Sequence, residues 1–125
     1  MKKSLFFGLI GFLSLLLLSL VSAVDLEVQK ESSDEVMIID LNKPAVFDLS
    51  IKNNGPTDDF MIYTFFGSGS LPKEKFAISS GQTRKIQFIV SPPYDDSKTG
   101  PVAFDYFIRG SDNSEYKNSL NAKAI

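Results

Sequence analysis

One alternating stretch constrains the fold of this chain more than any other. Within residues 44–56, the apolar side chains of Phe47, Leu49 and Ile51 alternate with polar neighbours. This two-residue period predicts a β-strand with one buried face and one solvated face. The stretch ends in Asn-Asn-Gly-Pro, which is typical of a turn because Asn and Gly tolerate positive φ and Pro cannot extend a ladder. Such a strand needs other strands to pair with its edges and cover its apolar face.

The remaining chain supplies those partner strands. Alternation or short apolar runs predict strands in residues 24–29, 60–66, 76–78, 83–90, 102–109 and 115–125. Residues 31–35 are expected to form a polar turn, and residues 67–70 a flexible break. Residues 36–41 are either a second piece of the edge strand or a strand that switches sheets. About seven strands with regular turn signals predict an all-β, antiparallel β-sandwich, with a small barrel as the competing architecture.

The first 23 residues have the pattern of an export signal. A basic start, Met1-Lys2-Lys3, precedes an almost wholly apolar run and then the small residues Val21-Ser22-Ala23. This order is typical of a signal peptide, so we expect cleavage after Ala23 and a single domain in residues 24–125. The alternative is an uncleaved membrane anchor, since the apolar run approaches the length that spans a bilayer. The expected localisation is therefore secreted or cell-surface.

Composition narrows the possible partners. Residues 24–125 contain 11 basic and 15 acidic side chains, a net charge of −4, which argues against nucleic acid as a partner. The chain has no Cys, so disulfides cannot stabilise a small exported domain. Its 11 Phe indicate that aromatic packing supplies the core instead.

Three segments together resemble a known family. They are PAVFDLSIKNNG (44–55), ISSGQTRKIQFIVSPP (78–93) and GPVAFDYFIRGSDNSEY (100–116). Their order of strands, Gly turns and terminating Pro resembles prokaryotic immunoglobulin-like surface modules of the CARDB and NEW3 kind. The resemblance implies an immunoglobulin-like sandwich that acts as a spacer or adhesive module in exported proteins. It implies no site residues, because these modules share no active site.

The sequence offers little catalytic chemistry. It contains no His and no Cys, which removes the commonest general base, the thiol nucleophile and most zinc or copper ligands. We therefore expect no enzyme activity, no catalytic residues and no cofactor. The acidic pairs Asp58-Asp59 and Asp95-Asp96 and the run Asp112 to Glu115 can be read as calcium ligands or as ordinary polar turns. The spacing of a calcium-binding loop is absent, so we expect no metal site.

A candidate interaction surface comes from the faces of two predicted strands. If Phe60 and Ile62 face the core, Tyr63 and Phe65 face outward, and the same alternation turns Phe107 outward on a neighbouring strand. Three exposed aromatic side chains on adjacent strands are typical of a docking surface. The alternatives are that a loop or the first strand covers them, or that the faces are reversed by a one-residue slip.

These features together favour an exported or cell-surface module with a structural or adhesive role. Its expected partner is a protein or a cell-surface polymer, and it would contact the membrane only through an uncleaved N-terminal segment. The alternative is an accessory binding domain of an exported enzyme or transport assembly.

Overall fold

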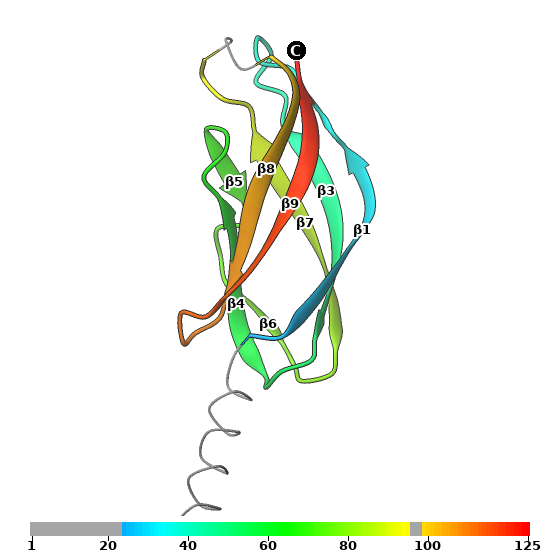
Figure 1. The fold of residues 1–125 in the computed structure, drawn as a ribbon, viewed down its shortest axis with the longest axis vertical. Coiled ribbons are helices and arrows are strands. Elements are labelled where there is room, and N and C mark those ends of the chain that lie inside the picture. Colours follow the sequence, from blue (N-terminus) through cyan, green and yellow to red (C-terminus); the bar gives the residue numbers. More distant parts are fainter. Residues whose placement is uncertain (1–23, 96–98) are drawn as a thin grey trace, which may run out of the picture.

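A computed structural model describes residues 24–95 and 99–125, which form two β-sheets packed face to face (Figure 1). The expected signal peptide, residues 1–23, and Asp96 lie outside the described residues. Among the residues described, no helix is long and apolar enough to cross a bilayer. The described residues contain nine strands: β1 (Leu26–Asp34), β2 (Val36–Met37), β3 (Ala45–Asn53), β4 (Asp58–Thr64), β5 (Gly69–Leu71), β6 (Phe76–Ile78), β7 (Thr83–Ser91), β8 (Gly100–Arg109) and β9 (Glu115–Ala124).

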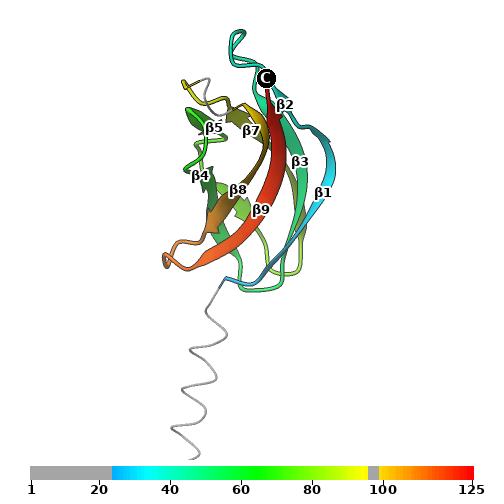
Figure 2. The same cartoon turned by 45° about the horizontal axis from the view of Figure 1, so that its top comes forward.

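The strands separate into two layers. The first sheet has the order β1-β3-β7-β5, and the second has the order β2-β9-β8-β4-β6. All pairs are antiparallel except β2 with β9, which is parallel. Figure 2 shows β1 and β3 on one side of the molecule and β4 and β8 on the other. The fold is therefore the predicted sandwich, and the competing small barrel is wrong.

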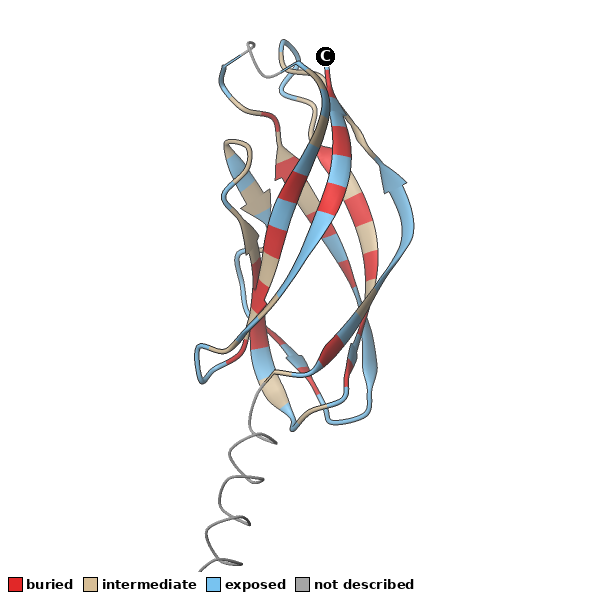
Figure 3. Cartoon of the chain, viewed as in Figure 1, coloured by how far each residue is buried: buried red, intermediate tan, exposed pale blue. Residues whose placement is uncertain are grey.

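The alternating stretch becomes β3, a central strand of the first sheet. It pairs with β1 on one edge and β7 on the other. Phe47, Leu49 and Ile51 are each at most 1% exposed, which confirms the predicted buried face. Figure 3 shows the same alternation of buried and exposed residues along β8 and β9.

Aromatic side chains join the two sheets, as the composition predicted. Phe47 of β3 meets Phe104 of β8 edge to face, with 5.9 Å between ring centroids. Phe88 of β7 meets Tyr106 of β8 at the same distance, 5.9 Å. Burying one such ring stabilises the fold by roughly 1.5–3 kcal/mol, so these contacts hold the sandwich closed without disulfides.

The polar turn expected at residues 31–35 is wrong, because β1 continues through it to Asp34. The strand stays paired with β3, with a register shift between Lys30 and Ser32. Every side chain from Gln29 to Asp34 is exposed. An edge strand that buries neither face leaves no two-residue pattern in the sequence, although its backbone is paired.

The short strand β2 carries the chain from one sheet to the other. Val36 and Met37 pair in parallel with Lys123 and Ala124 of β9 in the second sheet. Of the two expectations for residues 36–41, the strand that switches sheets is therefore confirmed. Met37 is fully buried and fixes this crossing against the core.

The expected flexible break at residues 67–70 contains the start of β5, which pairs with β7. Gly67 has φ of 78°, and a Cβ there would lie 2.2 Å from the Ser91 carbonyl oxygen. Only glycine fits that close approach. The short strands β2 and β5 account for the excess over the expected count of about seven strands.

Candidate interaction surface

The predicted faces of β4 and β8 are correct. Phe60 and Ile62 face the core at 2% and 1% exposure, which turns Tyr63 to the outer face of the second sheet. Tyr63 and Phe107 are direct partners on the neighbouring strands β4 and β8. Phe65 follows the end of β4 and is 82% exposed. The alternative in which the first strand covers these rings is wrong, because β1 belongs to the other sheet.

Tyr63, Phe65 and Phe107 form one compact group, called here the aromatic cluster. The Tyr63 and Phe107 rings stack with centroids 5.3 Å apart. The Phe65 ring lies 5.6 Å from each of the other two. Phe66 points the other way and stacks on Phe104 at 5.0 Å. The cluster is therefore an ordered outer surface, separated from the core by the sheet itself.

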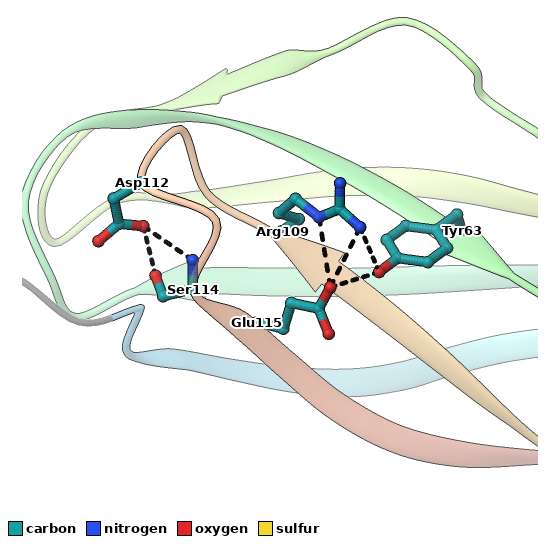
Figure 4. Close-up of polar contacts among 5 residues, drawn as sticks. All are labelled: Tyr63, Arg109, Asp112, Ser114 and Glu115. Carbon is teal, nitrogen blue, oxygen red and sulfur yellow. Dashed lines mark hydrogen bonds and ion pairs between the residues drawn. The ribbon is translucent and has the colours of Figure 1, made fainter.

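A charged pair borders the cluster on one side (Figure 4). The Arg109 guanidinium lies 5.0 Å from the centroid of the Tyr63 ring, a cation–π contact. Arg109 also donates a hydrogen bond of 2.9 Å to the Tyr63 hydroxyl and forms an ion pair of 3.2 Å with Glu115. The Tyr63 hydroxyl in turn donates to Glu115 at 2.5 Å. The phenol is thus held between a cation and an anion.

These contacts shift the pKa values of Tyr63 and Glu115 in opposite directions. Burial raises the pKa of Tyr63, and its hydrogen bond to Glu115 raises it further against the opposing effect of Arg109. The hydrogen bond from Tyr63 lowers the pKa of Glu115, and Arg109 lowers it further. Both shifts move away from neutral pH, where the phenol stays neutral and the carboxylate stays ionised.

A second polar group borders the other side. Asp105 of β8 forms an ion pair of 3.5 Å with Lys117 and accepts a hydrogen bond of 2.8 Å from Ser119, both on β9. Thr64 donates a hydrogen bond of 2.7 Å to the backbone carbonyl of Asp105. An apolar centre with a polar rim is the usual composition of a protein contact surface. The cluster and its two charged borders have that arrangement.

The sequence reasoning missed the polar border. Arg109 and Glu115 are direct partners on β8 and β9, and Arg109 is two residues after Phe107 on the same face. The two-residue period that placed Phe107 could have placed Arg109 beside it. The Tyr63 to Glu115 contact depends on the β8–β9 register, which strand patterns alone do not give.

Asp112 lies in the turn between β8 and β9, whereas Asp58 and Asp59 begin β4 instead of lying in a loop. Asp58 accepts a hydrogen bond of 3.1 Å from the backbone N–H of Ser111, and Asp112 accepts one of 3.1 Å from that of Ser114. Both bonds link the acidic side chains to the connection between β8 and β9. In the part of the chain that the structure describes, no group of three or more acidic side chains could hold a metal ion.

Two facing, largely antiparallel sheets with this strand order define an immunoglobulin-like β-sandwich module. No protein-family model matches the chain, and no curated protein matches it significantly. Solved structures do. A FixG-related protein from Vibrio parahaemolyticus is 7% identical with a TM-score of 0.61, over 81% of this chain and 95% of that one.

A second solved structure is a CARDB domain. This domain, from a Pyrococcus furiosus protein solved in complex with di-metal ions, is 12% identical with a TM-score of 0.53. The match covers 82% of this chain and 90% of that one. The chain therefore has a CARDB-like immunoglobulin-like fold, which confirms the fold that the sequence resemblance implied.

Proposed function

We propose that this chain is an exported or cell-surface immunoglobulin-like module that holds a partner protein through the aromatic cluster. The observation that supports this most is the Phe65 ring, which is 82% exposed yet packs against both Tyr63 and Phe107. A large apolar ring on an ordered surface loses little conformational freedom on binding. Contact through such a surface needs no catalytic residue.

The residue types favour a protein over a cell-surface polymer. Tyr and Arg are the side chains most enriched among residues that dominate protein–protein binding energy, and Phe is enriched at such interfaces. Tyr63 and Arg109 are held in place by their mutual hydrogen bond of 2.9 Å. The charged groups at the border pair with each other, through Arg109–Glu115 and Asp105–Lys117. The apolar cluster is therefore the part with unused contact area.

Export is supported by the order of residues before Val24. The basic, apolar and small-residue segments follow one another as in a signal peptide. The module would then work outside the cytoplasm, either released after cleavage at Ala23 or held by the same segment as an anchor. An adhesive or structural role is consistent with both locations.

The test is retention on cell envelopes. The exported product of the full chain is mixed with a purified envelope fraction of the producing organism and sedimented. Phe65→Ser is expected to reduce retention at least about tenfold, the effect of a single strong contact residue. Leu71→Ser is the matched control, because Leu71 is an exposed apolar residue on β5 of the other sheet. It is expected to bind like the unmodified protein.

Four outcomes separate the possible functions. Loss of retention after protease treatment of the envelopes supports a protein partner. Retention that survives protease but disappears after polysaccharide digestion would instead favour the polymer. Equal retention of Phe65→Ser and Leu71→Ser, with both variants folded, would contradict the proposal. A partner that proves to be a catalytic or transport subunit would assign the module to the accessory role.

A further inference from the structure

The described chain begins at the end of the sandwich where the β8–β9 turn lies (Figure 1). The backbone nitrogen of Val24 donates a hydrogen bond of 3.2 Å to the Ser114 hydroxyl, in that turn. The next residue, Asp25, accepts a hydrogen bond of 2.9 Å from the backbone of Asn54 through its carbonyl oxygen. Both contacts fix the position of the Val24 nitrogen before β1 begins.

The Ser114 hydroxyl is itself hydrogen-bonded to a carboxylate. It donates a hydrogen bond of 2.5 Å to Asp112, whose same oxygen also accepts the backbone N–H of Ser114 at 3.1 Å (Figure 4). A chain of donors therefore leads from Val24 through Ser114 to Asp112. A positive charge at the start of this chain would strengthen both hydrogen bonds, because ionised pairs bond more strongly than neutral ones.

A second carboxylate lies at the same place. A Cβ built on Gly110 would lie 2.8 Å from a methyl carbon of Val24, 2.9 Å from an Asp58 oxygen and 3.3 Å from an Asp112 oxygen. The three side chains thus converge around one glycine. The negative charge of Asp58 opposes ionisation of Asp112, although hydrogen bonds from Ser114 keep the pKa of Asp112 low. Two carboxylates therefore lie next to Gly110 and the Val24 side chain, and Asp112 is also joined to the Val24 nitrogen through Ser114.

We propose that this site holds the α-ammonium group that cleavage after Ala23 would create at Val24. The inference rests on the proposed export. Hydrolysis by an envelope peptidase adds water across the Ala23–Val24 peptide bond, breaks its C–N bond, and leaves a carboxylate on Ala23 and a protonated amine on Val24. One amide N–H then becomes three donors and a full positive charge, facing Ser114, Asp112 and Asp58.

Ionisation of the Val24 amine at this site would make the stability of the fold depend on pH. The carboxylates that converge near Val24 are Asp58 and Asp112, Asp25 is the next residue in the chain, and Lys75 is a cation that acts on Asp58. The nearby carboxylates of Asp58 and Asp112 would favour the charged amine, so we expect its pKa to lie above the ordinary 7.7–8.0 of an α-amino group. A group with a raised folded-state pKa stabilises the fold below about pH 8, and this contribution is lost as pH rises through the raised pKa.

The experiment uses the exported product of the full chain, labelled with ¹⁵N-valine. Mass spectrometry first identifies its first residue, and NMR then follows the Val24 amine during a pH titration. The amine pKa is expected about one unit above its ordinary value. Asp112→Asn is expected to return it toward about 8 while keeping both hydrogen bonds to Ser114. Asp59→Asn is the matched control, because Asp59 is exposed and lies next to Asp58.

The outcomes distinguish failure of the amine site from failure of the proposed export. A first residue of Val24 with an ordinary amine pKa, unchanged by Asp112→Asn, overturns this inference and leaves export intact. An uncleaved chain in the membrane overturns it as well and supports the anchor alternative. If Asp112→Asn does not fold, N-acetylation of the mature protein removes the charge without a substitution. At pH values below 8, acetylation is then expected to lower the Tm of the protein. An unchanged Tm would overturn the inference.

Discussion

At the scale of single residues, the buried side chain of Asn53 links the β3–β4 turn to the end of β6. Its amide nitrogen donates to the carbonyl oxygens of Pro56 at 2.8 Å and Ile78 at 3.0 Å. Its amide oxygen accepts the backbone N–H of Gly55 at 2.9 Å. Asn53 is the one buried polar side chain among the described residues, at 1% exposure. It satisfies backbone groups that the tight connections would otherwise leave unpaired.

Replacing this amide tests that role. Asn53→Ala is expected to lower the free energy of unfolding by about 2 kcal/mol, because two carbonyls and one N–H lose their partner in a buried site. Urea unfolding measures the change. Asn54→Ala is the control, since Asn54 is exposed and bonds to Asp25 through its backbone. Asn54→Ala should lower the free energy of unfolding by less than about 0.5 kcal/mol. Similar decreases in both variants would contradict this role for Asn53.

The sequence predicted this turn correctly but for the wrong reason. The Asn-Asn-Gly motif predicts a turn through its tolerance of positive φ. Among the described residues, positive φ occurs instead at Asn42, Asn113 and three glycines, none of them in the motif. The motif is used for the hydrogen-bonding capacity of Asn53, which depends on the neighbouring end of β6. A local pattern cannot show a contact to a strand 25 residues away.

At the scale of elements, the register of β4, β8 and β9 builds the candidate surface. Tyr63 pairs with Phe107 across β4 and β8, and Arg109 pairs with Glu115 across β8 and β9. The outward faces of β4 and β8 were predictable from alternation, because Phe60 and Ile62 mark the opposite face. The Arg109–Glu115 ion pair at the border was not predictable, because the register between strands depends on turn geometry as well as on the apolar alternation.

This three-strand contact should depend on pH in a definite direction. The pKa of Glu115 lies below its ordinary 4.5, so its stabilising contribution is present above that pH and is lost as pH falls through the lowered value. Glu115→Gln should therefore melt a few degrees below the unmodified protein at pH 6, and the difference should vanish near pH 3. Thermal unfolding followed by circular dichroism at both pH values measures this difference in Tm.

Tyr63→Phe provides the control, because the Tyr63 hydroxyl is the largest cause of the lowered Glu115 pKa. It should reduce the same pH-dependent difference, and adding Glu115→Gln to it should change little. A Glu115→Gln deficit that is equal at pH 6 and pH 3 would show that the contact does not stabilise the fold through its charge.

At the scale of the whole molecule, one hairpin connects the two proposed sites. The β8–β9 turn holds Ser114 and Asp112 beside Val24, and the strand ends next to it carry Arg109 and Glu115 beside Tyr63 (Figure 4). The core lies between the sheets, on the other face of β8. The surface that we propose as the partner contact can therefore vary without disturbing the aromatic packing that holds the sandwich together.

Most of this architecture was predictable from the sequence, because strands with one buried face leave a two-residue period. The continuation of β1 through residues 30–34 was not, since all its side chains there are exposed. The pairing of β5 was also missed, since a three-residue strand after Gly67 looks like a loop. Docking of Val24 onto Ser114 joins residues 90 positions apart and leaves no local signal.

The central claim is that the aromatic cluster touches a partner protein, and photo-crosslinking at Phe65 tests it most directly. Phe65→p-benzoylphenylalanine keeps an apolar aromatic side chain at the exposed position, and the same amino acid at Leu71 reports contacts of the other sheet. Irradiation of cells that export each variant is expected to give a protease-sensitive adduct from position 65 and none from position 71. Equal yields from both positions, or an adduct only from position 71, would contradict the claim.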